Sequence, residues 1–364
     1  MITNACASAS WLSARALFHA ARQLPEAAAD DPARHWHGHN FRADVRVPQS
    51  AIAEIYPGSA VNDFAAALRN AVEPFDYTRL NDHLATPDDA ALLAHICTAL
   101  PLSDAVISGH LRSRDDSGAS RADDGRYLLW RRYQFQAAHR LPYVPAGHKC
   151  GRMHGHSFAA VLHVDAPVRH QQIDAAWAPL QEQLHFHCLN DIPGLDNPTS
   201  EHLARWIWQQ LQERLPGLRW VTVFETGSCG ACYDGTRFRI WKDMTLDSAT
   251  RHTGAPSRDP RGRLHGYTYT LRLHLHADLD AVRGWTVDFG DVKALFAPLF
   301  ARLDHHRLDA LGPDFARGDT TALAQAIGLD AGALLPSLAR VDLLATPGCG
   351  SLWIRDGQPP ALPL

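Results

Sequence analysis

The stretch Gly147–Phe158, GHKCGRMHGHSF, determines how the rest of the chain is interpreted. His154 and His156 are two residues apart in a run typical of a β-strand, so both imidazoles project from one face. With His139, which ends a second strand-like run, they make three nitrogen ligands, the usual set of a catalytic zinc site with an open fourth position. Cys150 precedes the pair in a loop, which suits a reactive thiolate better than a ligand. The pattern predicts a metal site, although an isolated H-x-H pair is more often ordinary surface histidine.

Length and composition indicate a multidomain globular protein. The 364 residues suggest two or three domains, and the 46% hydrophobic and 20% charged content is typical of a chain that buries sizeable cores. A net charge of −4 offers no basic surface for nucleic acid, and no apolar run approaches the roughly 20 residues of a membrane span. The N-terminal stretch does not resemble a signal peptide. We therefore expect a small-molecule substrate and neither a nucleic-acid nor a membrane partner.

The seven cysteines are scattered, and their odd number favours reduced thiols in the cytoplasm over a disulfide framework. Cys229 and Cys232 form a C-x-x-C pair, but the sequence has no second such pair to complete a zinc site. We expect a cytoplasmic protein in which these two cysteines bind no metal.

A unit of two strand-like runs, an amphipathic helix and a turn recurs three times along the chain. His37, His154 and His265 are equivalent, at offsets of 117 and 111 residues. The equivalent turn positions are Asp76, His185 and Asp304. Because two independent landmarks share nearly one period, we predict three tandem α+β copies, over residues 1–124, 125–242 and 243–364. Residues 284–289, GWTVDF, are predicted as a strand of the third copy.

The middle copy resembles a known family. AAHRLP, CGRMHGH, CLNDIPGLDNPTSEHLARWIW and VFETGSCGACY are similar to the 6-pyruvoyltetrahydropterin synthases, and most closely to the bacterial 6-carboxytetrahydropterin synthases of queuosine and deazapurine biosynthesis. The resemblance implies the ββααββ tunnelling fold. It also implies that the three copies join as a pseudo-trimeric antiparallel β-barrel with helices outside, and that two such chains associate as a dimer of pseudo-trimers. Independent domains on a string are the alternative arrangement.

The resemblance also assigns roles, and these divide unevenly among the copies. The second copy has the zinc ligands His139, His154 and His156, the catalytic thiol Cys150, and a pterin anchor at Glu225 with Thr226 beside it. It lacks the family's catalytic Asp-His pair, because His185-Phe186 stands there.

The third copy has this pair as Asp304-His305 and retains His252 and His265, but it lacks the other parts. Arg261 stands at the position of the cysteine, Tyr267 at that of the second histidine of the strand, and Ala345-Thr346 at that of the Glu-Thr pair. The first copy keeps His37 and His39, with Arg22 at the third ligand and Asp76-Tyr77 in the turn. The second and third copies are therefore complementary, and we predict one composite site that takes Cys150 from one and Asp304 with His305 from the other. The alternative is that all three copies have lost catalytic residues independently and that the chain is a noncatalytic scaffold.

The implied reaction converts 7,8-dihydroneopterin triphosphate to 6-carboxy-5,6,7,8-tetrahydropterin, acetaldehyde and triphosphate. Lys149, Arg140 and Arg152 are candidates for the triphosphate, although solvated surface charge explains them equally well. Three other functions stay open: a noncatalytic pterin-binding scaffold, a pyruvoyltetrahydropterin synthase, and an aldolase or epimerase acting on dihydroneopterin. Histidines also bind other divalent ions, so the residues alone leave the metal open.

Overall fold

The computed structural model describes residues 8–102, 105–276 and 289–356, and in them one order of elements occurs three times. The first copy has β1 (Ala9–Arg22), β2 (His37–Pro48), α1 (Ala60–Val72), α2 (Asp89–Ala99), β4 (Ser108–Arg114) and β5 (Ser117–Arg121). The second has β6 (Tyr127–His139), β7 (His154–Asp165), α3 (His170–Leu184), α4 (Ser200–Leu211), β9 (Leu218–Thr226) and β10 (Cys229–Tyr233). The third has β11 (Phe238–Thr250), β12 (His265–Leu275), α5 (Phe289–Leu303), α6 (Thr320–Leu334), β13 (Leu338–Thr346) and β14 (Cys349–Ile354). Two short strands, β3 (Thr78–Arg79) and β8 (His187–Cys188), follow α1 and α3.

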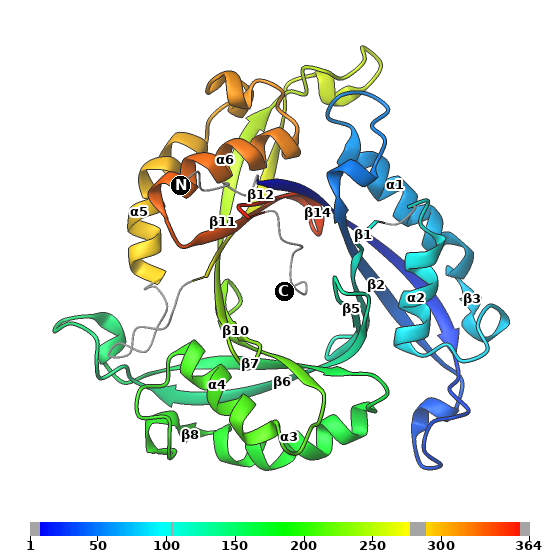
Figure 1. Ribbon diagram of the computed structural model, residues 1–364, viewed down its shortest axis with the longest axis vertical. Helices are drawn as coiled ribbons and strands as arrows, with labels where there is room; N and C mark the ends of the chain where they lie inside the picture. The colour runs from blue at the N-terminus through cyan, green and yellow to red at the C-terminus, as the bar shows by residue number, and fades with distance from the viewer. Residues whose placement is uncertain (1–7, 103–104, 277–288, 357–364) are drawn as a thin grey trace, which may run out of the picture. The chain divides into compact units, whose positions relative to one another are not determined.

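The chain forms two compact units. Figure 1 labels the helices and strands that each unit contains. The larger unit takes the described residues of 1–127, 245–272 and 297–364, and the smaller unit takes those of 128–244 and 273–296. In the larger unit β1 pairs antiparallel with β2 along its length and with β14 from Ala9↔Ile354 to Ser13↔Gly350. This pairing connects the first copy to the third.

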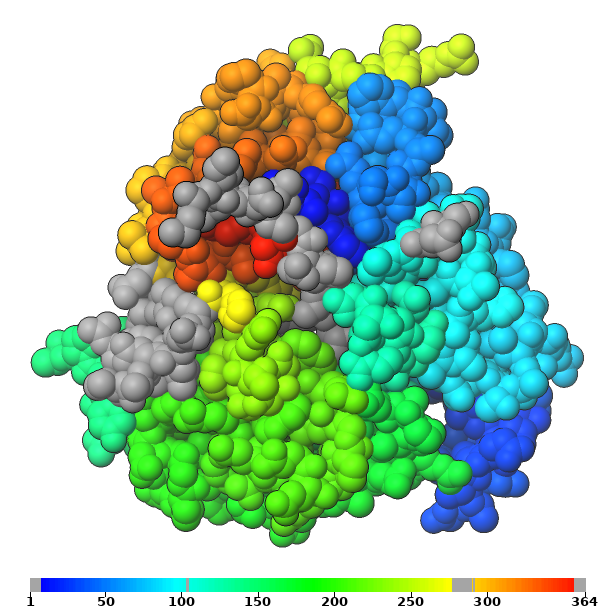
Figure 2. Space-filling model, viewed as in Figure 1, coloured from blue at the N-terminus to red at the C-terminus, as the bar shows by residue number. Residues whose placement is uncertain are grey.

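The second copy shows how the alternating sequence builds each layer. β6 and β7 pair antiparallel from Leu128↔Asp165 to His139↔His154, and β9 continues the sheet beside β7. One face of these strands is apolar and lies against α3 and α4, where Phe135, Phe158 and Trp177 are almost fully buried. The green atoms of this copy form one closely packed body in the space-filling view (Figure 2). Because the helices cover one face, the histidines at the strand ends are held in a fixed register.

Each second helix begins at a side-chain oxygen. The N-cap residues are Asp88, Thr199 and Asp319, and each accepts hydrogen bonds from backbone N–H groups of the following turn. The loop that leads into each cap therefore has a defined end. This loop also carries the backbone carbonyls that accept hydrogen bonds from side chains at the candidate active site and at the equivalent positions of the other copies.

The α+β class is confirmed, with antiparallel strands and paired helices in each of the three copies. The predicted strand at 284–289 falls outside the described residues except at Phe289, where α5 begins. Within the described ranges, no helix combines the length and apolarity needed to cross a membrane.

Candidate active site

Three histidines and one glutamate meet at the end of the second copy's sheet. His139 ends β6, His154 and His156 open β7, and Glu225 lies near the end of β9. One ligand atom from each of the four side chains lies within 4.8 Å of all the others. The structure thus brings together the three predicted metal ligands, and it adds Glu225 to them.

Backbone carbonyls orient two of these histidines. Nδ1 of His139 lies 3.0 Å from the carbonyl oxygen of Pro198, and Nδ1 of His154 lies 2.8 Å from that of Arg152. A carbonyl only accepts, so each Nδ1 carries the proton and each Nε2 keeps its lone pair. Metal-binding histidines commonly have this second hydrogen bond, because it fixes both the tautomer and the orientation of the ring.

The group fits a metal ion. Nε2 of His139 and of His156 is buried without a hydrogen-bond partner among the described residues, a costly state unless a ligand is bound. Nε2 of His156 also lies 3.2 Å from Oε1 of Glu225, so the carboxylate approaches the same point as the histidine nitrogens. Burial lowers the pKa of His139 to about 4, which keeps this imidazole neutral at physiological pH, as a metal ligand must be.

Glu225 is not a strand-end surface acid. Its Oε2 accepts a hydrogen bond of 3.0 Å from the Ser200 hydroxyl, and its side chain is only 20% exposed. Burial alone would raise the pKa of Glu225, but the contacts with His156, His139 and Ser200 outweigh it and hold the pKa below its ordinary value. The carboxylate is therefore ionised and fixed beside the histidines. Sequence reasoning missed Ser200, although it lies in the DNPTSE stretch that opens α4.

The other predicted residues of the second copy lie nearby in sequence but outside this group. Cys150 is half-buried in a 3-10 turn (Lys149–Gly151), and its carbonyl accepts from the Leu141 N–H at 2.8 Å, which ties the loop to the end of β6. The Thr226 hydroxyl accepts from the Ser228 N–H at 3.2 Å and lies 3.1 Å from the Cys229 sulfur, so it closes the turn between β9 and β10.

Two further predictions concern three basic residues and two cysteines of the second copy. Lys149, Arg140 and Arg152 are exposed to solvent. Cys229 and Cys232 are buried in β10, and neither belongs to the group described above.

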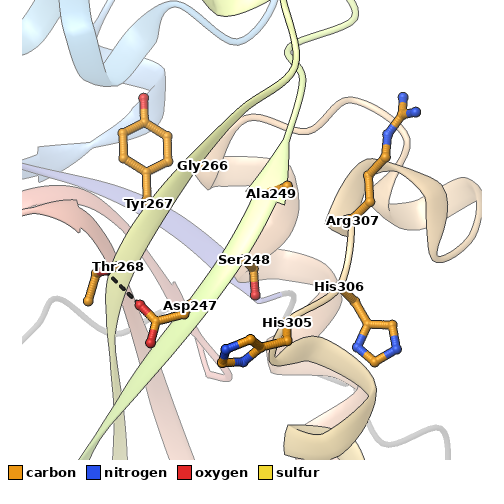
Figure 3. A pocket seen from close by; sticks show the side chains of 9 residues that line it. All are labelled: Asp247, Ser248, Ala249, Gly266, Tyr267, Thr268, His305, His306 and Arg307. Atoms are coloured by element: carbon orange, nitrogen blue, oxygen red, sulfur yellow. Dashed lines mark hydrogen bonds between the residues drawn. The ribbon is translucent and has the colours of Figure 1, made fainter.

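The Asp304-His305 pair lies in the larger unit, at the turn after α5. One Asp304 oxygen accepts from the Asp247 N–H at 2.9 Å, and the other lies 2.8 Å from Nδ1 of His305. This hydrogen bond to Asp304 raises the pKa of His305 above its ordinary value. The His305 side chain is 76% exposed and lines an open cavity of about 510 Å³ together with Asp247 and Thr268 (Figure 3). The pair therefore has the arrangement of a base aligned by a carboxylate.

The same turn occurs in all three copies with an unusual backbone. Tyr77, Phe186 and His305 have φ values of 54°, 61° and 56°, a left-handed conformation that residues other than glycine rarely adopt. The preceding side chains of Asp76, His185 and Asp304 each accept from a strand N–H. The turn thus presents one outward side chain in each copy, and only the third copy has histidine there beside aspartate.

Hydrogen bonds correct one expectation about the third copy. Leu141 N–H donates to the Cys150 carbonyl, and His252 N–H donates to the Arg261 carbonyl, so His252 corresponds to Leu141. The position of His139 is taken by Thr250, whose hydroxyl donates to the Gly318 carbonyl at 2.8 Å. The prediction that His252 is a retained ligand is therefore wrong. The third copy keeps only His265 of the three ligands.

In the first copy, the arginine Arg22 stands at the position of the metal ligand His139. Nη1 of Arg22 donates to the Pro87 carbonyl at 3.0 Å and to Oδ1 of Asp89 at 2.7 Å, and the side chains of Arg22 and Asp89 are each only 5% exposed. Burial and the charge of Arg22 lower the pKa of His39 to about 4. A guanidinium at this position repels a second cation, so the first copy is unsuited to bind a metal.

Replacing Arg22 with methionine should lower the free energy of unfolding by about 3–5 kcal/mol, because the buried carboxylate of Asp89 would lose its ion pair with Arg22. Urea unfolding of the wild type and the variant measures this difference. The double variant with Asp89→Asn should recover most of the loss. A single variant within about 1 kcal/mol of the wild type would contradict the buried ion pair.

The family model for 6-pyruvoyl tetrahydropterin synthase matches residues 128–236 and 239–352, which together make up more than half of the chain. The chain belongs to the 6-pyruvoyl tetrahydropterin synthase family. The two matches confirm that it carries tandem copies of this family's fold. The 6-carboxy-5,6,7,8-tetrahydropterin synthase of Synechocystis sp. is 34% identical over 125 residues, which cover 30% of this chain and 95% of that relative.

Solved structures of low similarity include another member of the family. The Caenorhabditis elegans 6-pyruvoyl tetrahydropterin synthase has a TM-score of 0.28 and 16% identity, over 31% of this chain and 92% of that chain. The uricase of Arthrobacter globiformis has a TM-score of 0.32 and 11% identity, over 59% of this chain and 80% of that chain.

Proposed function

We propose that the chain is a zinc-dependent carbon–carbon lyase, a 6-carboxytetrahydropterin synthase of queuosine and deazapurine biosynthesis. It would convert 7,8-dihydroneopterin triphosphate and one water to 6-carboxy-5,6,7,8-tetrahydropterin, acetaldehyde and triphosphate. The observation that carries the proposal is the convergence of His139, His154, His156 and Glu225 in the second copy. The name and 34% identity of the Synechocystis relative support the choice of substrate and product.

The three histidines would hold zinc through their Nε2 atoms. Bound there, the ion would polarise the hydroxyls of the substrate side chain and the carbonyl that develops from them, so that a neighbouring proton leaves more readily. The histidines are ready to bind the ion, because His139 is neutral and because backbone carbonyls fix the rings of His139 and His154.

Glu225 would anchor the pterin. An ionised carboxylate accepts two hydrogen bonds from the adjacent N–H and NH₂ groups of an aminopyrimidine edge, which sets the register of the ring. The Ser200 hydroxyl holds one carboxylate oxygen in place. We assign Thr226 to the same subsite because it follows Glu225 directly, while its hydroxyl also closes the turn.

Cys150, as thiolate, would accept the proton, and His305 aligned by Asp304 would assist by holding that proton or stabilising the thiolate. The parts are complementary: the second copy has the ligands and the thiol, and the third has the only Asp-His pair of the three turn positions. The two copies are also adjacent in sequence, since β11, which carries Asp247 beside Asp304, is the strand that follows β10 of the second copy. We propose one composite site per chain.

Purified chain incubated with 7,8-dihydroneopterin triphosphate tests the function. Acetaldehyde and triphosphate should appear in equal amounts. Triphosphate without acetaldehyde would indicate a pyruvoyltetrahydropterin synthase, and a glycolaldehyde fragment that still carries the triphosphate would indicate an aldolase. Binding of the pterin without turnover would indicate that the chain is a noncatalytic scaffold.

Glu225→Gln should lower kcat/KM by about 10- to 100-fold, because an amide replaces the charge that accepts both pterin hydrogen bonds. Glu182→Gln, the same change at an exposed position of α3, is the matched control and should leave kcat/KM unchanged. Metal content should stay the same in both variants. Loss of the metal in Glu225→Gln would instead make Glu225 a ligand and refute its role as the anchor.

We further propose a cytoplasmic location and association of two chains as a dimer of pseudo-trimers. The scattered free cysteines support the first proposal. The family resemblance supports the second.

A further inference from the structure

A second polar cavity, of about 140 Å³, lies within the larger unit, apart from the residues assigned above. Its charged lining residues are Arg15, Arg42, Arg46, Arg272, Asp44 and Asp342. They come from β1, β2, β12 and β13. Four guanidinium groups face two carboxylates there, so the lining carries an excess of positive charge.

The two carboxylates are already occupied. Asp44 accepts from Nε of Arg15 at 2.6 Å and from Nε of Arg42 at 2.8 Å. Asp342 is held at 2.5 Å by Arg340, which lies outside the cavity lining. Neither carboxylate is therefore available to neutralise Arg46 fully.

Arg46 is the buried arginine of this cavity, and hydrogen-bond donors of its guanidinium are left unused within the described ranges. It is 7% exposed, its closest carboxylate contact is the 4.0 Å approach to Asp342, and its Nε and Nη1 have no hydrogen-bond partner among the described residues. Burial, followed by repulsion from Arg340, lowers the pKa of Arg46 to about 9. A buried guanidinium with unused donors is costly unless an acceptor is present, and planar N–H pairs match the oxygens of phosphate.

The fold does not require these charges. Offsetting β2 by the 117-residue repeat places Ala159, Val161 and His163 of β7 at the positions of Arg42, Asp44 and Arg46. The second copy thus forms the same strand pair with two apolar residues and a histidine. The charged cluster is a particular feature of the larger unit.

We propose that this cavity binds a small oxyanion of the phosphate class, held by the free donors of Arg46 and by the neighbouring arginines. The ligand would be inorganic phosphate or the end of a short polyphosphate, because the cavity is small and its lining carries four guanidinium groups. The site does not depend on the proposed lyase activity.

Calorimetric titration of the phosphate-free full chain with inorganic phosphate, at constant ionic strength set by chloride, tests the proposal. One phosphate should bind per chain. Arg46→Met should weaken binding by about 10- to 100-fold, since it removes charge-assisted hydrogen bonds. Arg69→Met, the same change at an exposed position of α1, should leave binding unchanged.

Two further variants separate phosphate binding in this cavity from misfolding and from binding at the metal site. Asp44→Asn should tighten phosphate binding, since it removes a negative charge from the lining, and this opposite effect does not depend on the folding of Arg46→Met. His154→Ala should bind phosphate as the wild type does, because the histidine lies outside the cavity. Absence of saturable binding to the wild type, or equal affinity in Arg46→Met, would overturn the proposal.

Discussion

Replacing His305 with alanine should lower kcat for acetaldehyde release by about 100- to 10,000-fold, the usual contribution of a positioned acid or base. The effect is expected because Asp304 aligns the His305 ring at 2.8 Å and the turn presents it to solvent, where a substrate can reach it. Steady-state kinetics with 7,8-dihydroneopterin triphosphate measures the change. Unfolding by urea should be nearly unchanged, because the side chain is exposed.

The other two copies supply matched controls. Tyr77 and Phe186 occupy the same left-handed position of the same turn, and both are exposed. Tyr77→Ala and Phe186→Ala change the same backbone position as His305→Ala, but they remove no histidine that could act as acid or base. Both should keep kcat within about twofold of the wild type, since neither side chain is assigned to the site. Equal losses in all three variants would mean that the turn matters for structure and not for chemistry.

The pH profile of the same reaction gives a second readout of the pair. Asp304 raises the pKa of His305, so the Asp304→Asn variant should lower it. If neutral His305 is the active form, activity falls as pH drops through this pKa. The acidic limb of kcat/KM should therefore move to lower pH in Asp304→Asn. A limb that moves to higher pH would contradict the assignment.

His154→Ala should lose the bound metal and lower kcat by about 100-fold or more, because a Lewis acid is worth several kcal/mol in the transition state. Elemental analysis of the purified wild-type chain should find about one zinc ion per chain, as a single three-histidine site requires. Removal with a chelator should abolish turnover, and added zinc should restore it in the wild type but not in the variant.

His37 and His265 are the controls for this experiment. Like His154, each opens the second strand of its copy, and each has Nδ1 at 2.8 Å from the carbonyl oxygen two residues earlier. His37→Ala and His265→Ala therefore remove the same side chain from the same local structure. Both should retain the metal and the activity. A second or third metal ion per chain, lost on either change, would contradict a single metal site.

Much of the fold could be predicted because the repeats are visible in the residue pattern. Strands begin at His37, His154 and His265, and helices follow them in each copy, in the order that the repeated pattern indicates. The three predicted ligands are also together, because strand geometry places His154 and His156 on one face and pairs His154 with His139.

The errors and omissions have physical causes. The assignment of His252 as a ligand fails because histidines stand both at strand ends and in the loops beyond them, and only the hydrogen-bond register shows that Thr250 holds the ligand position. The contact of Glu225 with Ser200, and that of Arg22 with Asp89, join residues 25 and 67 positions apart. Sequence periodicity carries no information on such pairs, because they depend on the packing of helices against the sheet.

The central claim is that Cys150 and the Asp304-His305 pair act together in one site. A double-mutant cycle of kcat with Cys150→Ala and His305→Ala tests it most directly, since residues that act as a unit have strongly non-additive effects. The double variant should be no slower than the slower single variant. If the two losses multiply, or if His305→Ala keeps wild-type activity, the two copies do not share a site and the proposed mechanism is wrong.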